Sequence, residues 1–204
     1  MRLTLTCGFL SICLSAVLCP ALANGQSPLA TDPYVPLTVE KKAKIFAIRT
    51  IAPSSLLKSA VAAGISHWKD SPEEWHQGVT GYGHRFGHRM ATRGVENGIG
   101  FVVASALHED PRYFYLSQGT VGQRVGHGLK SAILTRTDNG GWRPSIWRVT
   151  SNYGAQFVSN AWRPESEHGV GDTLVRGTLS IGYDAAFNVF KEFWPDIRRK
   201  VFRR

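Results

Sequence analysis

The chain has 204 residues, and its 24 lysines and arginines against 15 aspartates and glutamates give a formal net charge of +9. This length is enough for one domain with a sizeable core and short for two. The only cysteines, Cys7, Cys13 and Cys19, lie near the start, which excludes disulfides, thiolate metal sites and cysteine nucleophiles from the rest of the chain.

Residues 1–23 have the features of a cleavable export signal. Arg2 supplies a short positive region, residues 3–18 are almost wholly apolar or small, and Ala21-Leu22-Ala23 fits an A-x-A cleavage site. Pro20 interrupts the apolar segment before it reaches the ~20 residues that a membrane-spanning helix needs. We therefore expect cleavage and export to the periplasm or the cell envelope.

Cys19 raises the alternative of a lipoprotein signal, although Leu18 is bulky where such signals carry glycine or alanine. Much of the positive charge of the remaining chain gathers at residues 198–204, which contain no acid. In an exported protein, this basic tail is expected to meet an anionic membrane surface or an envelope component, and not nucleic acid. The tail residues that would bind such a surface are Arg198, Arg199, Lys200, Arg203 and Arg204.

The first half of the chain predicts an extended segment followed by short helices. Residues 24–37 contain three prolines among small polar residues and are expected to be an extended lead-in. Thr38 is placed to cap a helix that runs to about residue 52, where Pro53 ends it and begins a second helix to about residue 69. A short third helix is expected after Asp70-Ser71-Pro72.

The longest predicted helix covers residues 81–107, and small residues recur along it at helical spacing. Glycine costs about 1 kcal/mol relative to alanine inside a helix, so this stripe predicts that another helix packs closely against it. The opposite face of the first half, which carries Arg85, Arg89 and Arg93, is expected to be solvated or ion-paired. The apolar second half is expected to be buried in a bundle, with burial in lipid as the alternative. The predicted packing residues are Gly83, Gly87, Ala91, Gly94, Gly98 and Ser105.

Three further helices are predicted at residues 121–135, 146–162 and 170–194. Pro195 is expected to end the last helix and leave the basic tail exposed. The residues from 138 to 141, Asp-Asn-Gly-Gly, predict a turn. No alternating pattern predicts a sheet. The expected fold is therefore all-α, a single-domain bundle of about five to seven helices over residues 38–197.

His84 and His88 have the spacing at which two imidazoles on one helix face can share a metal ion. An arginine follows each of them, and the candidate third ligands His108, Glu109 and Asp110 lie about 30 Å away along a straight helix. We therefore expect no metal and no cofactor.

The acids of His108-Glu109-Asp110 could act with the histidine as a general acid and base. The favoured interpretation is structural, with ion pairs to arginines of other elements such as Arg143, Arg148 or Arg163. No nucleophile elbow, Walker loop or dinucleotide fingerprint is present, so no catalytic residue is assigned. The six tryptophans mostly fall near predicted helix ends, which suits either an interfacial belt or the capped ends of a bundle.

Four segments resemble an uncharacterised family of exported bacterial proteins that has no assigned activity. They are Tyr82-Gly83-His84-Arg85-Phe86-Gly87, Asp110-Pro111-Arg112-Tyr113-Phe114, Thr135-Arg136-Thr137-Asp138 and Lys191-Glu192-Phe193-Trp194-Pro195-Asp196-Ile197. The resemblance implies an envelope location and transfers no residue role.

The sequence therefore favours a non-enzymatic, exported helical protein of the cell envelope, structural or interacting, that contacts a membrane or an envelope partner. The alternative is a periplasmic hydrolase that uses His108, Glu109 and Asp110, with or without a metal on His84 and His88.

Overall fold

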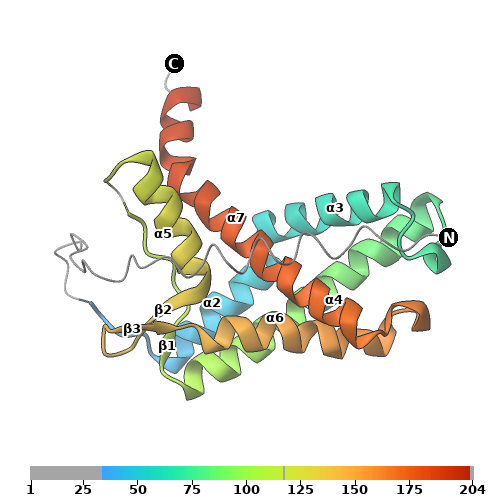
Figure 1. Ribbon diagram of the computed structural model, residues 1–204, viewed down its shortest axis with the longest axis horizontal. Helices are drawn as coiled ribbons and strands as arrows, with labels where there is room; N and C mark the ends of the chain where they lie inside the picture. The colour runs from blue at the N-terminus through green and yellow to red at the C-terminus, as the bar shows by residue number, and fades with distance from the viewer. Residues whose placement is uncertain (1–33, 117, 203–204) are drawn as a thin grey trace. The chain divides into compact units, whose positions relative to one another are not determined.

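A computed structural model describes residues 34–116 and 118–202 (Figure 1). The expected export signal and most of the extended lead-in lie outside the described residues, and residues 34–38 have no regular secondary structure. The described chain is 75% helical, with six α-helices and a small three-stranded sheet, which confirms the all-α class. The helices are α2 Val39–Ile51, α3 Pro53–Trp68, α4 Gly78–Ala106, α5 Val121–Ile133, α6 Ile146–Ser159 and α7 Val170–Phe202.

Local signals in the sequence place several helix boundaries. The Thr38 side chain accepts a hydrogen bond from the Lys41 backbone N–H at 3.4 Å and so caps α2. Pro53 occupies the first turn of α3, where its missing N–H has no cost. The short helix expected after Pro72 is the 3₁₀ turn η1, Glu73–Trp75. Two further 3₁₀ turns, η2 Asn160–Trp162 and η3 Glu165–Glu167, connect α6 to α7.

The small sheet was not expected from the sequence. It consists of β1 Glu109–Asp110, β2 Leu134–Thr137 and β3 Trp142–Pro144, which pair antiparallel in that order. The predicted turn at residues 138–141 joins β2 to β3, and the end of the predicted fifth helix forms β2 instead. These strands are two to four residues long, which is too short for an alternating pattern to be read.

The helices pack as two connected groups within the described chain. The long helix α4 packs along α6 and against α2 and α3, while α7 packs on α5 and α6 (Figure 1). Close backbone approach occurs at Gly128, where an added Cβ would lie 2.9 Å from the Val189 Cα of α7. Gly154 likewise faces Ile99 of α4, at 3.1 Å from its Cδ1.

The predicted packing stripe on α4 is wrong for contacts within the described chain. A Cβ added at Gly83, Gly87, Gly94 or Gly98 would meet no atom within 4 Å, Ala91 is exposed and Ser105 is half-buried. The helix turns its other face inward. This face carries Arg85, which was expected to be solvated or ion-paired and which is buried and ion-paired with Asp70. The buried residues are Gly81, Arg85, His88, Thr92, Asn97, Gly100 and Ala104.

The predicted end of the last helix is also wrong, because α7 continues through Pro195 to Phe202. A proline inside a helix removes one backbone hydrogen bond. Here the Arg124 guanidinium of α5 donates to the Glu192 carbonyl and to Asp196 Oδ2, the latter at 2.5 Å, and so stabilises both sides of the proline. Arg198, Arg199 and Lys200 are exposed residues of this helix, whereas Arg203 and Arg204 lie outside the described residues.

The described interior contains few large apolar side chains. Phe46 and Trp147 pack edge to face with their ring centroids 5.3 Å apart, and the remaining buried apolar side chains are those of alanines. Polar and charged residues fill most of the other buried positions, including Lys42, Glu109 and Glu192. Large apolar side chains are instead exposed on every helix. The usual distribution of polar and apolar residues is therefore inverted.

Candidate functional site

His108, Glu109 and Asp110 are held by different structural partners. Glu109 is fully buried, accepts from Arg143 Nη2 at 2.6 Å and from the Trp147 backbone N–H at 3.0 Å, and so caps the start of α6. Asp110 accepts from Arg112 Nη2 at 2.6 Å. His108 is exposed, with Nδ1 lying 3.4 Å from Asp138. Glu109 therefore has the ion-pair role that the sequence favoured, with Arg143, one of the arginines it named, as its partner. Asp110 is also ion-paired, but with Arg112 of its own segment and not with an arginine of another element.

His84 and His88 line a groove of about 580 Å³ on the open face of α4. Gly83 and Gly87, which have no Cβ, form part of its lining. The first half of the small-residue stripe therefore lines this groove. The Trp75 ring stacks on His84 at a centroid distance of 6.4 Å and lies 5.3 Å from His88. The lining is completed by Thr80, Ala91 and Trp162.

His88 is almost fully buried between two hydrogen-bond donors. Its Nδ1 lies 2.9 Å from the Trp162 indole nitrogen, and its Nε2 lies 2.6 Å from Arg163 Nη2. Burial, followed by the charge of Arg163, lowers the pKa of His88 to about 3. A neutral imidazole accepts at one nitrogen only, so one of the two donors is satisfied at a time.

His84 and His88 are therefore poorly placed to bind a metal ion together. Both ring nitrogens of His88 face donors, which leaves no lone pair directed at an added cation. Within residues 34–116 and 118–202, no three histidine, cysteine, aspartate or glutamate side chains are grouped to hold a metal ion. Aromatic rings and the backbone of two glycines line most of the groove. Its lining residues include no nucleophile that lies beside a general base.

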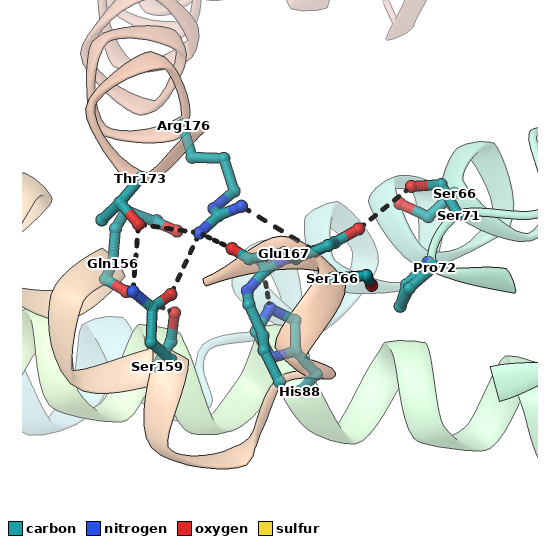
Figure 2. Close-up of polar contacts among 12 residues, drawn as sticks. Ser66, Ser71, Pro72, His88, Gln156, Ser159, Ser166, Glu167, Thr173 and Arg176 are labelled. Atoms are coloured by element: carbon teal, nitrogen blue, oxygen red, sulfur yellow. Dashed lines mark hydrogen bonds and ion pairs between the residues drawn. The ribbon is translucent and has the colours of Figure 1, made fainter. Parts of the chain in front are cut away.

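A polar network holds the α6–α7 connection behind this groove (Figure 2). Glu167 pairs with Arg163 and accepts from the Ser71 hydroxyl at 3.3 Å. From α7, Arg176 donates to the Glu167 carbonyl at 2.9 Å and to Thr173 Oγ1 at 3.0 Å (Figure 2). The connection is thereby fixed to the segment between α3 and α4, which positions the Trp162 wall of the groove.

Arg85 has a structural role that the sequence did not predict. Its guanidinium donates to the carbonyls of Ser71 at 3.1 Å, Pro72 at 2.8 Å and His76 at 2.6 Å, and to Asp70 Oδ1 at 3.1 Å. It closes the loop that carries Trp75 into the groove. Only the fold brings these carbonyls together, and the spacing of the arginines along α4 gives no sign of it.

Comparison of this chain with protein-family models, with curated proteins and with solved structures found no match.

Proposed function

We propose that the protein is a non-enzymatic helical protein of the cell envelope that rests against a lipid surface through the apolar outer faces of its helices. The observation that carries the proposal is the inverted distribution of side chains in the described chain. Apolar surface exposed to water costs roughly 25 cal/mol per Å², and contact with lipid removes this cost.

Helix α7 shows the inversion most fully. Its buried positions are polar, as at Thr173, Asn188 and Glu192. Its exposed positions include a series of large apolar side chains, which would be expected to face the core of a water-soluble bundle. They are Val170, Leu174, Val175, Leu179, Tyr183, Phe190, Trp194 and Ile197.

Helix α3 repeats the pattern. Ser55 and Ser59 face inward, while the outer face carries five large apolar residues. Because the apolar residues are spread over several helices and not gathered in one patch, an extended lipid surface fits them better than a single protein partner does. The exposed residues are Leu56, Leu57, Val61, Ile65 and Trp68.

Exposed tryptophans and basic residues favour an anionic lipid interface. Trp68 at the end of α3 is 84% exposed, and Trp142 and Trp194 are also exposed. Tryptophan is enriched where membrane meets water, and basic side chains near an anionic surface contribute about 1 kcal/mol each. By length and composition, no single described helix qualifies as a membrane span, and the α2–α3 pair, bent by 42°, qualifies only jointly.

Fractionation of cells that produce the full chain tests this proposal. We expect the protein to sediment with membranes, to resist extraction by high salt and to be released by detergent, because apolar contacts are not screened by salt. Release by salt alone would mean that only the basic residues bind. Recovery as a monodisperse protein in buffer without detergent would contradict the proposal.

A pair of lysine substitutions sharpens the test. Val61→Lys together with Leu179→Lys should shift the protein towards the soluble fraction, because both side chains are exposed on apolar outer faces. The matched control is Asn139→Lys in the β2–β3 turn, which should leave the distribution unchanged. Equal fractionation of all three proteins would show that these faces do not contact lipid.

A further inference from the structure

Four basic side chains from four helices face the interior of the described chain without an ion pair. They are Arg49 of α2, Lys58 of α3, Arg148 of α6 and Lys191 of α7, and none of them forms a salt bridge with a described residue. Arg148 is buried, the other three are half-buried, and Arg49 donates to the Pro111 carbonyl. A buried charge without a partner is unfavourable, so Arg148 in particular is uncommon unless something else neutralises it.

Aromatic rings show how close these groups are. The Trp147 ring has Arg148 Cζ at 4.8 Å and Arg49 Cζ at 5.7 Å from its centroid. The Phe187 ring has Lys58 Nζ at 3.0 Å and Lys191 Nζ at 5.0 Å. The four cations therefore lie in two pairs, each pair sharing one ring.

The acids nearby do not balance this charge. A fifth basic residue, Arg93, lies close to these four and pairs with Glu96 at 3.3 Å. Asp184 is the second acid near this cluster of five basic residues. Five basic groups against two acids leave an excess of three positive charges. Burial, together with the neighbouring basic groups, lowers the pKa of Lys58 and of Lys191 to about 8.

Arg148 is the least satisfied member of the cluster. Its side chain is only 7% exposed and makes no hydrogen bond with a described residue, and its Nε is buried without a partner. Glu109, an acid near it, is already committed to Arg143. The side-chain nitrogen of Asn188 on α7 is likewise buried without a partner.

A small cavity of about 10 Å³ lies beside Arg148. Tyr113 and Ser131 line it with their hydroxyl-bearing side chains, and Arg112, which is paired with Asp110, lies at its edge. This space takes one oxygen-sized group. Lys191 approaches the same place from α7, with its Nζ 5.2 Å from the centroid of the Tyr113 ring.

We propose that Arg148 anchors an interior binding site for a phosphate-type oxyanion, flanked by Arg49 and Lys191. A guanidinium binds two oxygens of such an anion side by side, and the lysine adds a point charge. The excess of positive charge suits an anion with about two negative charges. The phosphate belongs either to the free ion or to a lipid headgroup, and the site does not depend on the proposed contact of the outer helix faces with lipid.

Thermal unfolding of the full-length protein in detergent tests the site. Inorganic phosphate, added at constant ionic strength against chloride, should raise the melting temperature of the wild type saturably, because a ligand that binds the native state stabilises it. Arg148→Gln should fold, since it removes an unpaired buried charge, and should show no phosphate response. Lys191→Gln should weaken the apparent affinity roughly tenfold. The exposed control Lys69→Gln should respond as the wild type does.

Phosphorus analysis of the purified protein distinguishes the two sources of the anion. Phosphorus that is extracted into organic solvent from the wild type and is missing from Arg148→Gln identifies a lipid headgroup, including one bound so firmly that added phosphate has no effect. Phosphorus that stays in the aqueous phase identifies the free ion. A phosphate response that is equal in wild type and Arg148→Gln, or no response together with no bound phosphorus, would overturn the proposal.

Discussion

Two regions of this protein bury arginines, and their surroundings differ. Behind the groove, Arg85 is surrounded by three backbone carbonyls and one aspartate, and each of its guanidinium nitrogens has an acceptor. In the interior between α2, α3, α6 and α7, Arg148 Nε is buried without an acceptor among the described residues. The first arginine organises the chain itself, whereas the second is free to bind something else. Burial of a charged side chain therefore does not by itself indicate a function. Whether the side chain is structural or able to bind a ligand depends on the acceptors around it.

The largest effect is expected where the arginine is fully paired. Arg85→Met should destabilise the fold by about 3–5 kcal/mol, because three backbone carbonyls lose their buried donor and the half-exposed Asp70 loses its partner. Denaturant unfolding in detergent would measure the change. Arg89→Met, which loses one hydrogen bond to Ser66, serves as the control and should cost far less. Equal stability of the two variants would remove the contrast between the regions.

The groove region should also show a pH dependence that comes from His88. Its folded-state pKa of about 3 lies below the value of about 6.5 in an unfolded chain. The stability from neutral His88 is therefore complete above pH 6.5 and is lost as the pH falls towards 3, by about 3 kcal/mol at pH 4.

His88→Gln should flatten the fall in unfolding free energy between pH 6.5 and 4, because glutamine does not titrate. His84→Gln, at the exposed histidine of the same groove, should keep the wild-type slope. An unchanged slope in His88→Gln would show that His88 is charged in the folded protein at moderately low pH, and that the Arg163 contact does not hold it neutral.

A smaller effect is expected from two glycines that distinguish packed from open helix faces. Gly128→Ala should destabilise by about 1–3 kcal/mol, since its Cβ would lie 2.9 Å from the Val189 backbone. Gly94→Ala should stabilise by up to about 1 kcal/mol, because its Cβ meets no described atom and alanine favours the helix. Loss of stability in Gly94→Ala would mean that another chain packs on this stripe.

The sequence predicted the helices well where the signal is local. Thr38 and Pro53 act within a few residues of the boundaries they set. The prediction that the last helix ends at Pro195 was wrong, because the helix there is stabilised by Arg124, which is 72 residues away from its partner Asp196 in the chain. No nearby residue signals that the helix continues.

The faces of α4 could not be assigned from periodicity alone. A repeat of small residues shows which residues share a face, and whether this face turns inward depends on what the other helices offer. Here the interior offers carbonyls and acids, so Arg85 is buried and the glycines remain open. The groove escaped prediction for a related reason. Trp162 comes from a segment 74 residues away from His88, and Trp75 is folded back over α4 by the loop that Arg85 holds.

The central claim, that apolar outer faces meet lipid, is most directly tested with single cysteines, since the chain after residue 19 contains none. Leu179→Cys on α7 and Asn139→Cys in the β2–β3 turn would each carry an environment-sensitive fluorophore in the presence of anionic vesicles with spin-labelled acyl chains. We predict a blue-shifted, strongly quenched emission at position 179 and an unquenched, water-like emission at position 139. Water-like emission without quenching at both positions would contradict the account.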